Sequence, residues 1–152
     1  MFCSCSESIK IPDVVTNIDN DAVIEYAGTE YECHIVRLTD GVVSISINSP
    51  ENLSCLTFRR ADGKFSVSYG ELLCKTDSVL LPETSFPTMI INILSVTNNQ
   101  ENLIYQSAEN GLVTFTGNSD TGEFRIITDT DGNITEILQE TEGLKVSIAY
   151  SE

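Results

Sequence analysis

The sequence predicts a mainly β (α+β) fold, in which a strongly curved antiparallel sheet or incomplete β-barrel of about 10–12 strands wraps around one buried helix. Three observations lead to this prediction. Pairs of Asp or Asn with Gly separate strand-like runs, apolar and polar side chains alternate within those runs, and one apolar segment near 85–96 has helical spacing instead.

The tight turns are the strongest local signal. An Asp-Gly or Asn-Gly pair supplies the positive φ angles that a two-residue hairpin needs, and four such pairs lie between strand-like runs. They are Asp40-Gly41, Asp62-Gly63, Asn110-Gly111 and Asp131-Gly132. Residues 26–29 and 118–122 are predicted to be two further hairpin connections.

Alternation within the runs indicates a sheet with one packed and one solvated face. Val43, Ile45 and Ile47 point one way, for example, and the serines between them point the other. The predicted strands are 12–17, 21–27, 30–38, 41–48, 54–61, 64–69, 71–75, 103–107, 111–117, 122–128, 133–139 and 143–150.

The segment 85–96 is predicted to form a helix that begins near Pro87, because proline is tolerated in a first helical turn. It is apolar on almost every side, so we expect it to lie buried in the concavity of the sheet. Its β-branched isoleucines leave a strand as the alternative. The helical face consists of Phe86, Met89, Ile90, Ile93 and Leu94.

Charge and length limit the function classes. The chain of 152 residues has 8 basic and 23 acidic side chains, a net charge of −15. Such a field repels nucleic acids and anionic membrane surfaces. No apolar run is long enough to span a membrane. We expect a monomer with one half-barrel domain at 10–152, preceded by a flexible tether or leader remnant at 1–9.

The start of the chain resembles the end of a bacterial lipobox. In Phe2-Cys3-Ser4-Cys5 a small residue precedes a cysteine, and polar residues follow. Cys5 is therefore the candidate for lipidation, with a leader expected upstream and an extracytoplasmic, membrane-anchored location. The alternative is a short tail with two incidental thiols.

The sequence offers no catalytic or metal site, and we expect no enzyme activity and no cofactor. The single histidine, His34, follows Cys33 on a predicted strand, where neighbouring side chains point to opposite faces. Residues 129–133 fit a hairpin turn better than a calcium loop, and 17–21 are only a weak calcium candidate. Cys33, Cys55 and Cys74 are expected to be buried small residues, with one disulfide among them as the alternative.

Several short motifs occur together along the chain. They are Tyr26-x-Gly28-x-x-Tyr31, Ser49-Pro50-Glu51-Asn52-Leu53, Leu56-Thr57-Phe58, Val67-Ser68-Tyr69-x-x-Leu72, Leu81-Pro82 and the hairpin from Gly122 to Ile134. Together these motifs resemble a family of uncharacterised lipoproteins from Gram-positive, Clostridium-like bacteria. That family in turn resembles the lipoprotein-carrier fold, a half-barrel that can hold acyl chains in its concavity.

The resemblance implies a non-enzymatic, lipoprotein-like domain that binds an apolar or amphipathic, lipid-like ligand on the concave face of the sheet. The alternative is a surface module for protein–protein interaction, with a solidly packed core and no small-molecule ligand. The expected ligand-lining residues are Phe65, Val67, Tyr69, Phe86, Met89 and Ile93.

Overall fold

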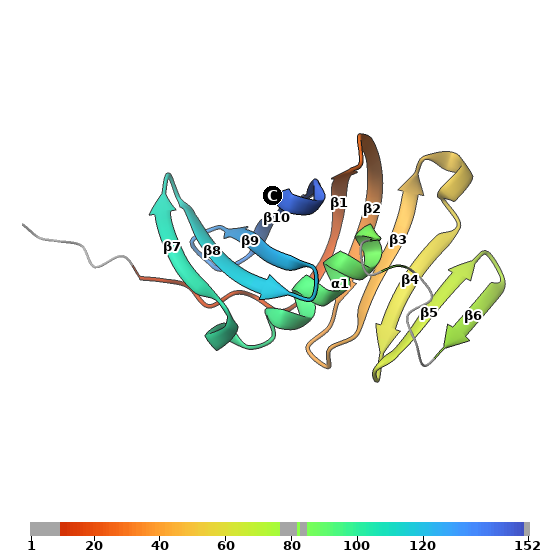
Figure 1. Ribbon diagram of the computed structural model, residues 1–152, viewed down its shortest axis with the longest axis horizontal. Helices are drawn as coiled ribbons and strands as arrows, with labels where there is room; N and C mark the ends of the chain where they lie inside the picture. Colours follow the sequence, from red (N-terminus) through yellow and green to blue (C-terminus); the bar gives the residue numbers. More distant parts are fainter. Residues whose placement is uncertain (1–9, 77–81, 83–84, 151–152) are drawn as a thin grey trace, which may run out of the picture.

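Eleven strands of the computed structural model join in one antiparallel sheet, which holds the helix α1 on its concave side (Figure 1). The structure describes residues 10–76, 82 and 85–150. Its elements are β1 (Ile18–Tyr26), β2 (Thr29–Arg37), β3 (Val43–Ser49), η1 (Glu51–Leu53), β4 (Leu56–Ala61), β5 (Lys64–Tyr69), β6 (Leu72–Thr76), α1 (Phe86–Val96), η2 (Gln100–Asn102), β7 (Ile104–Glu109), β8 (Leu112–Ser119), β9 (Gly122–Thr128), β10 (Ile134–Gln139), η3 (Glu140–Glu142) and β11 (Leu144–Ile148).

The strand order β6-β5-β4-β3-β2-β1-β11-β10-β9-β8-β7 places the first and last strands side by side in the middle of the sheet. All other neighbours are consecutive in sequence. The two edges are β6 and β7, so the chain must pass from one edge to the other between them. The helix α1 belongs to this crossing and lies over the concave face (Figure 1).

The six predicted turns are confirmed. The β4–β5 turn, for example, has φ +52° at Asp62 and +73° at Gly63, as the Asp-Gly pair predicts. Each turn joins two neighbouring antiparallel strands, and the pairs β2–β3, β7–β8 and β9–β10 each contain a register shift. Outside these irregularities the inward and outward faces follow the alternation read from the sequence.

The predicted strand at 12–17 is wrong. No strand covers these residues, and β1 begins at Ile18, earlier than expected. The segment crosses the β9–β10 turn, where the Val15 N–H donates to the Gly132 carbonyl at 2.8 Å. The Val14 N–H donates to the Gln100 side chain at 3.1 Å. These two donors are therefore satisfied by a turn and a side chain, without a neighbouring strand.

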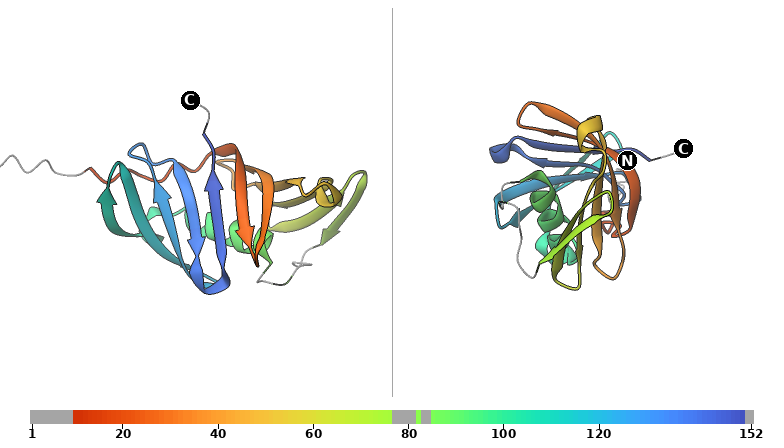
Figure 2. Two further views of the ribbon diagram at one scale, coloured as in Figure 1. Left: turned by 90° about the horizontal axis from the view of Figure 1, so that it is seen from above. Right: turned by 90° about the vertical axis from the view of Figure 1, so that its right-hand side faces the viewer.

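The helix α1 fills the concavity, as predicted. Met89, Ile90, Ile93 and Leu94 have no exposed surface, and the helix packs chiefly against β8 and β3. The end view shows the sheet curling around it (Figure 2). Burial of each such side chain contributes about 1.5–3 kcal/mol, so this contact is a principal source of stability.

Among the described residues, no helix is long and apolar enough to cross a membrane.

Candidate functional site

The predicted ligand-lining residues lie on the concave side, but most of them are core residues. Phe65 and Phe86 are buried, and Met89 and Ile93 are fully covered. Only two of the six reach the surface: Val67 is half-buried, and Tyr69 is 50% exposed. Whether any of the six touches a ligand stays a prediction.

Phe86 and Phe65, two of the six residues, lie near different parts of α1. The Phe86 ring packs against Tyr31, with centroids 4.7 Å apart, near the β1–β2 turn. Phe65 is the cross-strand partner of Arg60, which bonds to Asn92 on α1. Asn92 lies six residues beyond Phe86, about 9 Å along the helix axis.

The inner face of the β5–β6 hairpin continues the apolar layer beyond the cover of α1. Tyr69 pairs across the hairpin with Leu72, and the two side chains share the inner face with Phe65 and Val67. Leu72 is 74% exposed, which is unusual for a large apolar side chain on the packed face of a sheet. We call Tyr69 and Leu72, with the half-buried Leu56 and Val67 beside them, the apolar strip.

Two arginines occupy the inner face as well. Cross-strand register places Arg37 on β2, Val43 on β3 and Arg60 on β4 in one row beneath α1. The two arginine Cα atoms are therefore about 10 Å apart, the width of two strand spacings. The other buried inward side chains of β2 and β3 are apolar. A charged side chain is therefore unusual in these surroundings.

Arg37 is 1% exposed and incompletely bonded. Its Nη2 donates to Asn98 Oδ1, just beyond the C-terminus of α1, whereas its Nε and Nη1 have no hydrogen-bond partner. Among the described residues no carboxylate pairs with it. Burial lowers the pKa of Arg37 to about 10, so the guanidinium is still charged at neutral pH.

Arg60 lies at an open groove of about 330 Å³. Its Nη1 donates to Asn92 Oδ1 at 3.4 Å. This groove, which we call the arginine groove, brings together β4, one side of α1, η2 and the β8–β9 turn. Its lining residues are Arg60, Asn92, Ser95, Val96, Asn102 and Asp120.

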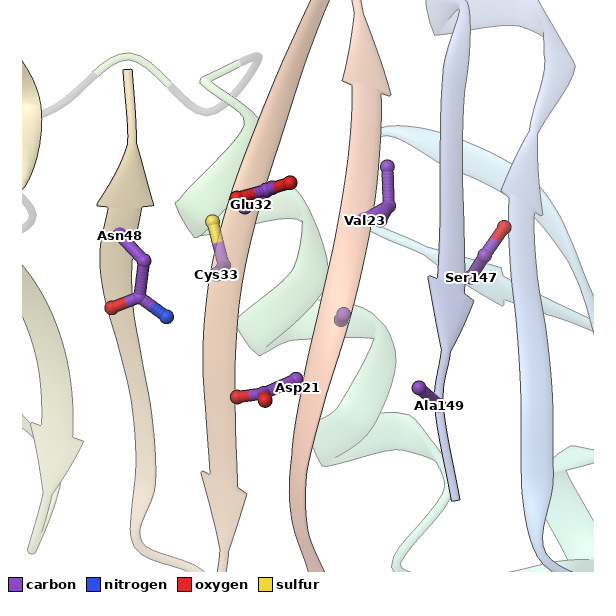
Figure 3. A pocket seen from close by; sticks show the side chains of 8 residues that line it. Asp21, Val23, Glu32, Cys33, Asn48, Ser147 and Ala149 are labelled. Carbon is purple, nitrogen blue, oxygen red and sulfur yellow. The ribbon is translucent and has the colours of Figure 1, made fainter. Parts of the chain in front are cut away.

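The outer face carries a hollow of about 300 Å³ over β1, β2, β3 and β11. Figure 3 shows Asp21 and Glu32 beside it, with the short side chains of Ser147 on β11 and Ala149 just after that strand. Because those side chains are short, the longer ones around them leave a shallow depression. Its open shape and the carboxylates of Asp21 and Glu32 suit a surface contact better than an enclosed small molecule.

His34 lies at the next hollow on the same face, held between two carboxylates. Its Nε2 is 2.6 Å from Asp19 Oδ1 and its Nδ1 is 2.7 Å from Asp21 Oδ1. Hydrogen bonds to Asp21 and then Asp19 raise the pKa of His34, because they favour the imidazolium. Both ring nitrogens are thus engaged, and Asp19 and Asp21 are the carboxylates of the weak calcium candidate at 17–21.

The thiols and the second calcium candidate also have clear places. Cys33 is buried on the face opposite His34, and burial raises its pKa to about 12. Cys55 and Cys74 are exposed, contrary to the expected burial, and the three described cysteines form no disulfide. Asp129 Oδ1 accepts from the N–H groups of Asp131 and Asn133 at 2.9 Å, so residues 129–133 form the predicted hairpin turn. Cys3 and Cys5 lie outside the described residues.

Arg37 is the residue that sequence reasoning missed. The signal was present, because the alternation that directs Cys33 and Ile35 inward also directs Arg37 inward. Arg60, in the same row, belongs to the pair Arg59-Arg60, whose side chains the alternation directs to opposite faces.

No protein-family model matches the chain, and no curated protein matches it.

Proposed function

We propose that this protein is a non-enzymatic binding domain that takes an apolar or amphipathic, lipid-like molecule on the concave side of its sheet. The observation that carries the proposal is the apolar strip. Tyr69 and Leu72 extend the packed inner face into a region where α1 does not cover it. Uncovered apolar surface continuous with a core is typical of a binding surface.

The arrangement of α1 supports the same function. The helix packs chiefly on β8 and β3, near the middle and one side of the sheet, and the β5–β6 hairpin extends past it (Figure 1). An acyl chain laid along the strip would cover Tyr69 and Leu72 without displacing the fully buried Met89 and Ile93. The ligand-binding surface would therefore be shallow and lie beside the core.

The strip is tested by exchanging its two most exposed residues for serine. The double variant Tyr69→Ser/Leu72→Ser should bind a fluorescent fatty-acid analogue about tenfold more weakly, because losing this apolar contact costs about 1.5 kcal/mol. Leu73→Ser is the matched control. Leu73 is 56% exposed on the same hairpin but points to the outer face, so its exchange should leave the affinity unchanged.

Native mass spectrometry of the domain purified from cells gives an independent test, since a bound lipid would add a discrete mass. If no such mass appears and the wild-type protein does not bind the fluorescent fatty acid, the ligand-binding function is wrong. An equal loss of affinity for Leu73→Ser and the double variant would place the contact elsewhere.

A lipid anchor at Cys5 and an extracytoplasmic, membrane-anchored location belong to the same proposal. They are tested separately by incorporation of labelled palmitate in the native host. The wild-type protein should be labelled and Cys5→Ala should not, whereas equal labelling of Cys3→Ala and wild type would show that Cys3 is not the acceptor.

The second candidate is a protein–protein interaction module, which one observation favours. The centre of the concavity is filled, and the hollow beside Asp21 and Glu32 is open, shallow and acidic. Such a surface suits a basic patch on another protein. If this function is right, Glu32→Lys abolishes co-purification of a partner and leaves fatty-acid binding unchanged. The ligand-binding function predicts instead that Tyr69→Ser/Leu72→Ser weakens fatty-acid binding more than Glu32→Lys does.

A further inference from the structure

The unpaired guanidinium of Arg37 requires an explanation that the rest of the fold does not supply. A buried charge costs several kcal/mol unless it is paired and fully hydrogen-bonded. Here one nitrogen bonds to Asn98 and two have no partner. The carbonyl groups at the C-terminus of α1 offer some compensation, because that end of a helix carries partial negative charge. They do not satisfy the two free nitrogens.

The arginine groove lies over the same part of the molecule. Val96 and Asn102 line the groove, and Asn98, which covers Arg37, lies between them in the chain. Arg60 borders the groove and is the second inward cation of the row that contains Arg37. Among the described residues Arg60, like Arg37, forms no ion pair. Two arginines without an ion pair therefore lie on either side of Val43: Arg60 lines the groove, and Arg37 lies behind Asn98.

We infer that the arginine groove receives the anionic head group of an amphipathic ligand, with Arg60 at its surface and Arg37 behind it. This inference rests on the proposed function, because it assigns the polar end of the molecule whose apolar end lies on the apolar strip. In the occupied state an oxyanion accepts hydrogen bonds from guanidinium N–H groups, from Arg60 at the groove and from the Arg37 nitrogens that have no partner in the free protein.

The positions of the two sites on β5 agree with a single ligand. Phe65 pairs with Arg60 at one end, and Tyr69 pairs with Leu72 at the other, four residues away. The distance along the strand is about 13 Å, which suits a medium-length acyl chain between a head group and the apolar strip. The half-buried Val67 lies between these two ends on the same face.

The surroundings favour one negative charge over several. Asp120 is on the wall of the same groove, and the whole chain carries a net charge of −15. A polyanion would be repelled by both, whereas a carboxylate or a zwitterionic phosphodiester brings no more than one uncompensated charge. The chemistry shared by these two head groups is a single oxyanion, and the experiment separates them.

The experiment measures dissociation constants by calorimetry at neutral pH for four surfactants with the same tail. Dodecanoate has a carboxylate head, dodecylphosphocholine a zwitterionic phosphodiester, dodecyl maltoside a neutral sugar and dodecyltrimethylammonium a cation. All are used below their micellar concentrations. We expect dodecanoate or dodecylphosphocholine to bind at least tenfold more tightly than dodecyl maltoside, and the stronger of the two identifies the oxyanion.

Arg60→Gln should remove about tenfold of that affinity, the loss expected for one charge-assisted hydrogen bond, and leave dodecyl maltoside unaffected. Arg59→Gln is the matched control, because it makes the same charge change at the neighbouring, outward-facing residue. Arg37→Met should also lower the affinity for the oxyanion. Its melting temperature without ligand should equal or exceed that of the wild type, because an unpaired buried charge is removed.

The outcomes separate this inference from the proposed function. If all four surfactants bind equally and Arg60→Gln changes nothing, the ligand-binding function stands and the anionic head group is wrong. If none binds, both are wrong. If Arg59→Gln weakens dodecanoate as much as Arg60→Gln does, long-range charge explains the preference and the arginine groove is not the site. A destabilised Arg37→Met with unchanged selectivity would show that Arg37 is structural, and Arg60→Gln then decides the question alone.

Discussion

His34 is the residue whose protonation state the structure couples most directly to stability. Its folded-state pKa is raised by hydrogen bonds to Asp21 and Asp19, so the folded protein binds the proton more tightly than the unfolded chain does. The resulting stabilisation is present below the unfolded pKa of about 6.5 and is lost as the pH rises through the folded value. This is a surface effect that salt weakens.

We predict that His34→Gln is less stable than the wild type at pH 5.5 and that the difference is smaller at pH 8.5, in low salt. Urea unfolding of both proteins at the two pH values measures the difference. Using the difference between variants cancels the general pH effect of the many carboxylates. A gap that widens as the pH rises would contradict the assigned protonation.

Gly132 shows how one residue holds the N-terminal segment in place. A Cβ atom there would lie 1.9 Å from the Asp13 carbonyl oxygen, and its φ of +89° disfavours any other residue. Gly111 has a similar φ of +77° with open space around it, so it reports backbone strain alone.

We predict that Gly132→Ala costs more than about 2 kcal/mol of unfolding free energy, whereas Gly111→Ala costs about 1 kcal/mol. Thermal or urea unfolding of the two variants tests this. Equal losses would mean that the segment at 10–17 moves away from the β9–β10 turn at little cost.

At the scale of elements, the helix α1 covers the apolar inner face of the sheet, as a second sheet does in a β-sandwich. It is the apolar cover of the central inner face, and its fully buried residues contact β8 and β3. The β5–β6 hairpin lacks this cover, which explains why its inner face is exposed at Leu72. The extent of α1 therefore decides which part of the inner face is packed core and which part is exposed as the candidate ligand site.

We predict that Ile93→Ala lowers the unfolding free energy by about 2–5 kcal/mol, because it leaves a cavity at a fully buried position. Val96→Ala, on the same helix but half-buried beside the arginine groove, should cost about 1 kcal/mol. Denaturant unfolding of both variants is the measurement. A loss of only about 1 kcal/mol for Ile93→Ala as well would indicate that α1 is loosely packed at its buried face.

For the whole molecule, the dominant long-range term is the net charge of −15. Like charges on a compact protein repel one another and reduce its stability. Screening is weak at about 0.01 M salt, where the Debye length is about 30 Å, and strong at about 0.1 M, where it is about 10 Å.

We therefore predict that the melting temperature rises between these two salt concentrations at pH 7. Near the isoelectric point of about 4.2 the same change of salt should have little effect, which is the internal control. A fall in melting temperature with salt at pH 7 would mean that ion pairs such as Arg125–Glu140 outweigh the general repulsion.

The sequence by itself determined the local structure. Asp62-Gly63 and the other X-Gly pairs produce hairpins because few residues adopt positive φ, and the alternating runs follow from the two-residue period of a strand. The helix α1 could be predicted for the same reason, because the helical spacing of its apolar residues and the position of Pro87 in its first turn are local properties. The prediction of a strand at 12–17 was wrong because the backbone of this segment hydrogen-bonds to the β9–β10 turn, which is distant in sequence.

Only the tertiary structure decided which distant residues meet. The pairing of β1 with β11 and the position of α1 on the sheet depend on contacts between segments far apart in the chain. The row that joins Arg37 to Arg60 depends on the registers of the consecutive strands β2, β3 and β4. The contact of Asp19 and Asp21 with His34 depends on the register of the β1–β2 hairpin, which the structure fixes at Asp21 opposite His34. Side-chain periodicity assigns a residue to a face, but which neighbours it meets there depends on how the whole sheet packs around the helix.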